Sequence, residues 1–228
     1  MNVVNDRLIH LLDSWPCCNV GTVQILDLPK RERDFFNVFM PAARTAIALG
    51  HHVTTEEEWT WYATDTGGEY CTADNHTIAV CETIKAVLKE TGHQARIVSY
   101  PGESGLQFRY VAQAAGLGRI GTNAFLFHPE WGPWIHLRVL ATTAQVDFRS
   151  RPSGDELCNQ CGLCVTECPA GAILDAEFIG LQCRSYRQAK GEYEPYGLER
   201  ELRYCKQCIW VCPQGEHPAE RSIEQTQP

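Results

Sequence analysis

Hydrophobic side chains recur along residues 1–150, called the front part of the chain below, with the spacings of amphipathic helices and buried strands. Spacings of three and four residues predict helices that begin near residues 5–6, run from residues 74–75 to Gly92, and cover 106–115. Continuous or alternating apolar runs predict strands over 20–28, 45–49, 96–100, 124–127 and 135–141. Residues 54–70 hold three consecutive glutamates and several aromatic side chains with little periodicity. This segment could be a lid, a partner surface or a long loop.

Length and composition limit the classes of protein that the chain can be. With 228 residues, 44% of them hydrophobic, it can bury one sizeable core and add a small second domain. The net charge of −8 does not favour general electrostatic binding to nucleic acid. No apolar run approaches the roughly 20 residues that span a bilayer, and the N-terminus lacks the apolar core of a secretory signal. We therefore expect a soluble, cytoplasmic protein that does not enter a membrane.

The strongest chemical signal is a group of eight cysteines between Cys158 and Cys212. The first four follow C-x2-C-x2-C-x3-C-P, which is the spacing of bacterial ferredoxins. A tight loop of this kind delivers three thiolates from one side of a cubane cluster, so the fourth must come from elsewhere. Cys183 follows alone, and a C-x2-C-x3-C-P run ends the region. Eight thiolates suit two four-iron clusters.

The order of these cysteines also predicts which cluster each one binds. In two-cluster proteins, the cysteine before each proline ligates the other cluster. The predicted ligands of one cluster are Cys158, Cys161, Cys164 and Cys212, and those of the other are Cys168, Cys183, Cys205 and Cys208. A structural zinc site also uses C-x2-C pairs, but it needs only four thiolates and leaves both Cys-Pro steps unexplained. A disulfide framework does not suit clustered cysteines in a chain without a secretory leader.

Two further pairs of metal-binding residue types lie in the front part of the chain. Cys17 and Cys18 are adjacent and could ligate a metal or exchange disulfides, although free cysteines more usually act as small buried hydrophobic side chains. His51 and His52 end a predicted strand, where neighbouring side chains point to opposite faces. We therefore favour structural roles for both pairs.

Gly116, Gly118 and Gly121 match the G-x-G-x-x-G fingerprint of dinucleotide-binding loops. Such a loop follows a strand and begins a helix, and an acidic residue stands about 20 positions later. Here the glycines follow a predicted helix and precede a predicted strand, and neither Glu130 nor Asp147 stands at the right distance. We therefore reject a nicotinamide site. The glycines still indicate a backbone that bends sharply or closely approaches another group, and a large flat cofactor would explain them.

Several segments together resemble the epoxyqueuosine reductases and the related reductive dehalogenases. They are A-G-L-G-R-I-G-T-N over 115–123, W-G-P-W over 131–134, P-A-A-R over 41–44, and the eight-cysteine region with C-R-S-Y over 183–186. The likeness runs from about Asp27 to Glu216. Its most specific part is the cysteine region combined with 115–123, because ferredoxin spacing alone is shared by many redox proteins.

The resemblance implies an α+β fold, in which a nitroreductase-like α/β sandwich precedes a small bacterial-ferredoxin-like domain with two [4Fe-4S] clusters. The implied boundaries are 1–150 for the first domain, 151–216 for the second, and 217–228 for a polar tail. Base-off cobalamin is implied as a further cofactor, to which the clusters would deliver single electrons at low potential. Its expected contacts are Gly116, Leu117, Gly118, Ile120, Gly121, Asn123, Trp134 and Arg138.

Three departures from the family pattern bear on the substrate. Epoxyqueuosine reductases carry a proton-donating aspartate in a D-x-G-P stretch, whereas this chain reads S-Y-P-G-E-S over 99–104. Tyr100, Glu103 or Tyr110 could take its place, because a phenol or a protonated carboxyl group can donate a proton. Thr122 replaces a frequent lysine, and the chain stops soon after the clusters, without the helical-repeat extension that helps the family hold tRNA. With the acidic net charge added, we do not expect tRNA to be the substrate.

Two functions of different classes remain open. One is a compact corrinoid-dependent reductase that acts on a small molecule and takes electrons from an external low-potential donor. The other is a non-catalytic protein that binds a corrinoid or a partner corrinoid protein. Its clusters would then only pass electrons to that corrinoid. The missing aspartate and lysine favour the second function, whereas the aromatic residues Trp59, Trp61 and Tyr62 favour the first.

Overall fold

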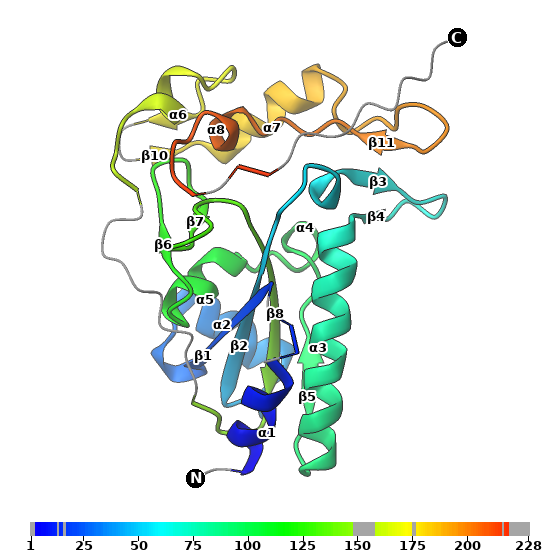
Figure 1. Ribbon diagram of the computed structural model, residues 1–228, viewed down its shortest axis with the longest axis vertical. Coiled ribbons are helices and arrows are strands. Elements are labelled where there is room, and N and C mark those ends of the chain that lie inside the picture. Colours follow the sequence, from blue (N-terminus) through cyan, green and yellow to red (C-terminus); the bar gives the residue numbers. More distant parts are fainter. Residues whose placement is uncertain are drawn as a thin grey trace.

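A four-stranded antiparallel sheet forms the centre of the front part of the chain (Figure 1). The structure is a computed structural model that describes residues 3–12, 14–15, 17–147, 158–174, 177–215 and 217–218. The strands lie in the order β1 (Cys18–Gln24), β2 (Thr45–His52), β8 (Ile135–Thr142) and β5 (Ala95–Ile97), with every neighbouring pair antiparallel. The central strands β2 and β8 are almost wholly buried, which agrees with their near-continuous apolar sequence.

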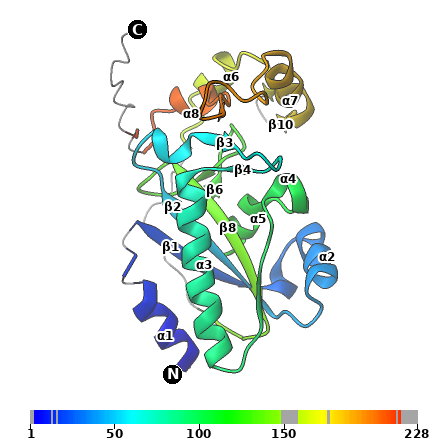
Figure 2. The ribbon, with the colours of Figure 1, turned by 90° about the vertical axis from the view of Figure 1, so that its right-hand side faces the viewer.

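Helices cover both faces of this sheet, so the front part has three layers (Figure 2). One face carries α1 (Val3–Leu12) and α3 (Thr72–Glu90), and the other carries α2 (Lys30–Phe39) and α5 (Phe108–Ala114). Side chains of β2 alternate between the two cores: Ala46 packs toward α5, and Ile47 packs toward α3. Small alanines on one face and larger aliphatic residues on the other thus set the distances of the two helical layers.

The turn after α5 is shaped by a close approach of two backbone segments. The short strands β6 (Arg119–Ile120) and β7 (Leu126–Phe127) follow α5 and pair with each other. Two other short elements, η1 (Ile25–Asp27) and α4 (Pro101–Ser104), lie earlier in the chain. A Cβ atom at Gly118 would overlap the carbonyl oxygen of Phe127, and one at Gly121 would overlap the Phe127 ring. The glycines predicted that the backbone closely approaches another group, and the structure shows that this group includes Phe127 of β7.

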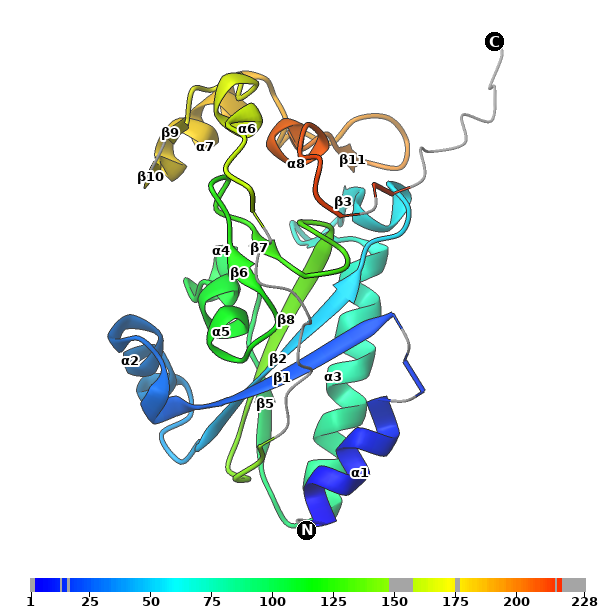
Figure 3. The same cartoon turned by 60° about the vertical axis from the view of Figure 1, so that its left-hand side comes forward.

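The cysteine-rich region lies at one end of the sheet and is joined to the front part by strand pairing (Figure 3). Its elements are α6 (Leu163–Thr166), β9 (Ile173–Leu174), β10 (Glu177–Phe178), α7 (Gly180–Ala189), β11 (Glu201–Leu202) and α8 (Gln207–Trp210). The front part adds η2 (Glu57–Trp59), β3 (Trp61–Ala63) and β4 (Glu69–Tyr70), and β11 pairs with β3 to give a three-stranded sheet in the order β11-β3-β4. Backbone hydrogen bonds therefore connect the two parts.

An apolar cluster fills the junction between the two parts. Trp59, Trp61 and Trp134 of the front part pack with Leu202 and Ile209 of the cysteine-rich region. Because both parts contribute fully buried side chains to this cluster, separating them would expose apolar surface to water. The junction is thus held by packing as well as by the β11–β3 pairing.

Several sequence expectations need correction at their boundaries. The long helix begins at Thr72, and Asp74 is a buried residue inside it instead of its cap. The strand expected over 20–28 ends at Gln24 and continues as η1. Residues 54–70 are not a long loop, since they form η2, β3 and β4, and the lid and partner-surface interpretations stay predictions.

The structure bears on the expected fold class but not on the expected domain boundaries. The mixed fold of helices and strands is confirmed, whereas its nitroreductase-like character stays a prediction. The boundary expected at 150–151 lies outside the described residues, and so does nearly all of the tail expected over 217–228. Within the described ranges, no helix combines the length and the apolar character needed to cross a membrane.

Candidate functional site

The eight predicted cluster ligands come together in two groups. Cys158, Cys161 and Cys164 line one small cavity, and Cys212, two residues after α8, lines the same cavity. In the second group, burial and the neighbouring thiols Cys205, Cys168 and Cys183 raise the pKa of Cys208 to about 12. The grouping follows the crossed pattern expected from the sequence, and the assignment of each cysteine to a cluster stays a prediction.

Hydrogen-bond donors lie beside two of these sulfur atoms, those of Cys158 and Cys168. Burial acts to raise the pKa of Cys158, but hydrogen bonds from Thr122 and Gln160 outweigh it and lower the pKa. The Thr122 hydroxyl lies 3.6 Å from Cys158 Sγ, and the Ala172 N–H donates to Cys168 Sγ at 3.4 Å. Donors of this kind stabilise thiolates, which are the form that ligates iron. Two sets of four sulfur atoms with nearby donors fit two iron–sulfur clusters.

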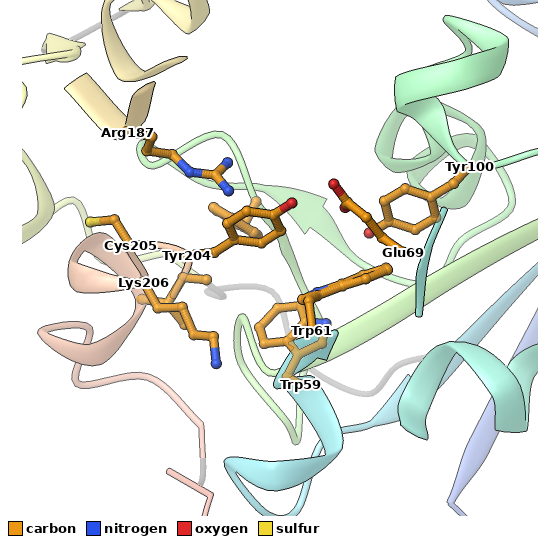
Figure 4. Close-up of a pocket in the computed structure, with 10 residues that line it drawn as sticks. Trp59, Trp61, Glu69, Tyr100, Arg187, Tyr204, Cys205 and Lys206 are labelled. Carbon is orange, nitrogen blue, oxygen red and sulfur yellow. The ribbon is translucent and has the colours of Figure 1, made fainter. Parts of the chain in front are cut away.

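A cavity of about 210 Å³ lies at the junction of the front part and the cysteine-rich region (Figure 4). One wall is mainly aromatic and comes from the front part. The opposite wall carries charged and polar groups and includes one predicted cluster ligand. The lining residues are Trp59, Trp61, Glu69, Tyr100 and Phe125 from the front part, and Arg187, Tyr204, Cys205, Lys206 and Ile209 from the cysteine-rich region.

A second cavity of about 250 Å³ adjoins the first and is more polar. Tyr204 and Lys206 line both cavities, so these two side chains stand between them. Glu56 and Thr60 belong to the front-part wall of the second cavity, and Arg203 belongs to the opposite wall. The two cavities together follow the junction between the two parts of the molecule.

Tyr100, one of the proton-donor candidates, lines the first cavity. Its ring stacks on His136 at 5.7 Å between ring centroids and 10° between ring planes, and Trp61 lies 5.2 Å away. Burial raises the pKa of the Tyr100 hydroxyl, with the nearby Cys71 and Asp74 adding to the effect. The phenol therefore stays protonated at neutral pH and can donate a proton.

A buried ionic network lies behind the aromatic wall. Arg138 donates to both carboxylate oxygens of Asp74, through Nε at 2.7 Å and Nη2 at 2.5 Å. Burial acts to raise the pKa of Asp74, but hydrogen bonds from His136 and Arg138 outweigh it and lower the pKa. The Trp59 indole N–H donates to His136 Nδ1 at 2.9 Å, so His136 Nε2 carries the proton that Asp74 accepts at 2.9 Å. The network thus fixes the orientation of Trp59.

Glu69 and Tyr204 come together at the lining of the first cavity. Figure 4 shows the Glu69 carboxylate beside the Tyr100 ring and opposite the Tyr204 hydroxyl. Burial and a hydrogen bond with Glu69 raise the pKa of Tyr204. The Glu69 carboxylate therefore places a hydrogen-bond acceptor at the cavity.

The residues expected to contact a corrinoid lie elsewhere in the described structure. None of them is among the residues that line the two junction cavities. Leu117 is fully buried in the main core, and Arg138 is engaged with Asp74. Asn123 donates to the carbonyl oxygen of Cys208 at 3.1 Å, and Trp134 packs edge-on against Trp210 at 4.9 Å. Contacts of all eight residues with a corrinoid stay predictions.

The other two proton-donor candidates differ from Tyr100. Tyr110 lies on α5 with the Arg109 guanidinium 5.2 Å from its ring centre, and it does not line either junction cavity. Glu103 belongs to α4, but its side chain lies outside the described part of the chain. Sequence reasoning missed Glu69, Arg187 and Tyr204, none of which stands in a recognisable motif.

The chain is similar in sequence to several known proteins. Residues 157–215 match the family of 4Fe-4S double cluster binding domains. The epoxyqueuosine reductase of Listeria monocytogenes is 31% identical over 152 residues, which cover 64% of this chain and 39% of the relative. That of Synechocystis is 25% identical over 230 residues, which cover 95% of this chain and 78% of the relative. The chain resembles the epoxyqueuosine reductases.

Solved structures extend the likeness to the fold. An epoxyqueuosine reductase with an epoxyqueuosine-modified tRNA stem loop superposes with a TM-score of 0.66 and 19% identity, over 93% of this chain and 66% of that chain. A reductive dehalogenase, described with a mechanism for B12-dependent dehalogenation, gives a TM-score of 0.54 and 20% identity, over 85% and 29% of the two chains. The expected resemblance to epoxyqueuosine reductases and dehalogenases is confirmed.

These findings also confirm the α+β fold class with a ferredoxin-like cluster domain and the two [4Fe-4S] clusters as cofactors. The chain spans less than half the length of some epoxyqueuosine reductases that it matches, for example 39% of the Listeria monocytogenes protein and 49% of the Staphylococcus aureus protein.

Proposed function

We propose that the protein is an iron–sulfur reductase that uses a corrinoid at the junction between its two parts. One observation carries the proposal: Tyr100, a protonated phenol, and Cys205, a predicted cluster ligand, line the same cavity. A reduction that consumes electrons and protons needs a source of each beside the reacting molecule. The resemblance to epoxyqueuosine reductases and to a dehalogenase linked with B12 supports this function.

The shape of the junction supports a large, flat cofactor. Each cavity alone is smaller than the about 300–1,000 Å³ of pockets that bind drug-sized ligands. Because Tyr204 and Lys206 alone are shared by both cavities, rotation of these side chains would join them into a space within that range. The flat aromatic surface of Trp59, Trp61 and Phe125 suits a ring system. When bound, a corrinoid supplies the reductive chemistry that side chains lack.

Each part of the cavity then has a task that follows from its chemistry. Trp59 and Trp61 exclude water from the reacting groups, and Tyr100 donates a proton through its hydroxyl oxygen. The Asp74–His136–Arg138 network holds Trp59 and supports the Tyr100 ring from behind. Arg187 and Lys206 place positive charge on the opposite wall, which favours an anionic substrate or an anionic side group of the cofactor.

The substrate that we favour is a small molecule taken up from solution, with electrons from an external low-potential donor. A modified base in tRNA is the second candidate, because the relatives are named for epoxyqueuosine and one was solved with a tRNA stem loop. The net charge of −8 disfavours a large polyanion. Parallel turnover assays with a free nucleoside and with a modified tRNA stem loop would separate the two.

The test of the proposal begins with an anaerobic preparation that carries both clusters. The protein is mixed with hydroxocobalamin, desalted, and followed by visible and paramagnetic resonance spectroscopy during reductive titration. We expect about one corrinoid per chain to remain bound and to give a base-off cobalt(II) signal. Two intact clusters without retained corrinoid would contradict the proposal and would move the protein to the class that reduces a partner corrinoid protein.

A further inference from the structure

A second group of metal-binding side chains lies in the front part, away from the cluster cysteines. Cys17 precedes β1, Cys18 is its first residue, and His51 lies opposite Cys18 in the β1–β2 pairing. One sulfur or nitrogen atom from each of these three residues lies within 4.8 Å of the other two. None of the three lines either junction cavity.

The distances suit a single tetrahedral metal ion. Cys18 Sγ lies 3.7 Å from His51 Nδ1. In a tetrahedral zinc site with bonds of about 2.3 Å to sulfur and 2.0 Å to nitrogen, those two atoms stand about 3.5 Å apart. Cys18 and His51 are therefore already at a ligand-to-ligand distance, and a small rotation of Cys17 would complete the three-residue set. Thiolates with imidazole form a donor set that favours zinc among the common divalent ions.

The far side of the His51 ring supports the same conclusion. His51 Nε2 lies 3.6 Å from Glu58 Oε1, and it has no hydrogen-bond partner among the described residues. The other carboxylate oxygen of Glu58 accepts from the Thr54 N–H at 2.7 Å and the Thr55 N–H at 3.3 Å, which fixes the carboxylate in place. Metal-binding histidines commonly present their second ring nitrogen to a carboxylate.

We propose that Cys17, Cys18 and His51 bind one zinc ion, with Glu58 orienting the His51 ring and water in the fourth position. Cys18 and His51 are buried, and Cys17 is partly exposed, so the ion has a route from solvent. Zinc binding releases the thiol protons to solvent, because the thiolate is the form that ligates the metal. The site is separate from the proposed reductase function and does not depend on it.

The experiment uses the full chain with both iron–sulfur clusters assembled under anaerobic conditions. The protein is dialysed against buffers of fixed free Zn²⁺ concentration, and zinc and iron are counted by mass spectrometry. Zinc X-ray absorption then reports the ligands without interference from iron. We expect one zinc per chain, unchanged iron, and a shell with two sulfur atoms at about 2.3 Å and one imidazole nitrogen at about 2.0 Å.

Three variants make the assignment specific. Cys17→Ser, at a partly exposed position, should lose the bound zinc while the fold and the iron content stay intact. Glu58→Gln should weaken zinc binding about 10- to 100-fold, as loss of an orienting carboxylate does. Cys71→Ser changes a buried cysteine outside the group and should bind zinc as the unchanged protein does.

The competing interpretation is a buried hydrogen bond, in which the Cys18 thiol donates to His51 Nδ1 and no metal binds. That interpretation predicts no zinc at stoichiometric level, or zinc that enters only as iron is lost. Either result would overturn the proposal, and so would equal zinc binding by Cys17→Ser and Cys71→Ser. A shell of oxygen ligands only would do the same.

Discussion

The Tyr100 side chain owes its chemical character to its neighbours. Trp61, Phe108 and His136 surround the ring, and the Arg138 guanidinium lies 5.2 Å from its centre. Residues 99–104 contain no aspartate, and only the fold shows that the phenol reaches the cavity. The proton donation that we propose for Tyr100 therefore depends on these surroundings.

Replacing Tyr100 by phenylalanine tests this role. Tyr100→Phe keeps the ring and removes the hydroxyl, so we expect turnover to fall about 10²- to 10⁴-fold, the usual contribution of a positioned proton donor. Iron content and corrinoid retention should not change, since the ring and its packing remain. The matched control is Tyr110→Phe on α5, which lies outside both junction cavities. Similar turnover for the two variants would rule out Tyr100 as the donor.

The Asp74–Arg138 pair gives a second prediction at the residue scale. Asp74→Asn removes the carboxylate charge and leaves the buried Arg138 guanidinium without compensation. We expect the free energy of unfolding to fall by about 3–5 kcal/mol, measured by urea unfolding with tryptophan fluorescence. Glu82→Gln, which breaks the exposed Glu82–Lys85 pair, should change it by less than about 1 kcal/mol. Equal effects would show that the buried pair does not stabilise the fold.

The sequence could predict single residues only where spacing encodes chemistry. The cluster cysteines follow a fixed spacing, so they are recognisable without a structure. Asp74 and His136 belong to α3 and β8, far apart in the chain, and nothing local marks them as partners. His136 and Arg138 are polar residues in an otherwise apolar strand, and this was the one sign that a buried partner must exist.

At the scale of elements, long periodic segments were predictable and short ones were not. The strands β2 and β8 and the helix α3 contain enough apolar residues for their periodicity to be recognised. The strands β3, β4 and β11 have two or three residues each, too few for any pattern. Their pairing depends on tertiary contacts, and the places of Glu69 and Tyr204 in the cavity were therefore missed.

The loop before β8 offers a test of how tightly the two parts are joined. Gly132 has a left-handed backbone (φ +58°), and a Cβ atom there would overlap the carbonyl oxygen of Gln214. Gly92 is also left-handed (φ +82°), but open space surrounds it. Both glycine-to-alanine changes incur about 1–2 kcal/mol of backbone strain, and only Gly132→Ala must also displace residues 214–215.

We therefore expect Gly132→Ala to lower the melting temperature more than Gly92→Ala and to speed amide hydrogen exchange over 212–215. Thermal unfolding and exchange mass spectrometry on the protein with both clusters would measure these effects. If the two variants lose the same stability, the close approach at the junction contributes nothing to it.

For the whole molecule, the crossed cysteine pattern predicts how the clusters depend on one another. Cys183→Ala removes one predicted ligand, so iron should fall by up to about four atoms per chain and one paramagnetic signal should change. The other cluster should remain recognisable, because its four predicted ligands are intact. Cys81→Ala, a buried cysteine in the core between α1 and α3, should keep the full iron content. Unchanged spectra in Cys183→Ala would remove Cys183 from the ligand set.

The strand pairing between β11 and β3 also sets a length inside the molecule. It fixes Cys205, three residues after Leu202, against the aromatic wall that begins at Trp61. Electron tunnelling slows steeply with distance, and a span fixed by backbone hydrogen bonds varies little from molecule to molecule. The final electron step should therefore have a uniform rate whichever external donor delivers the electron. A change of external donor should alter only the rate of electron transfer at the outer surface, where the donor docks.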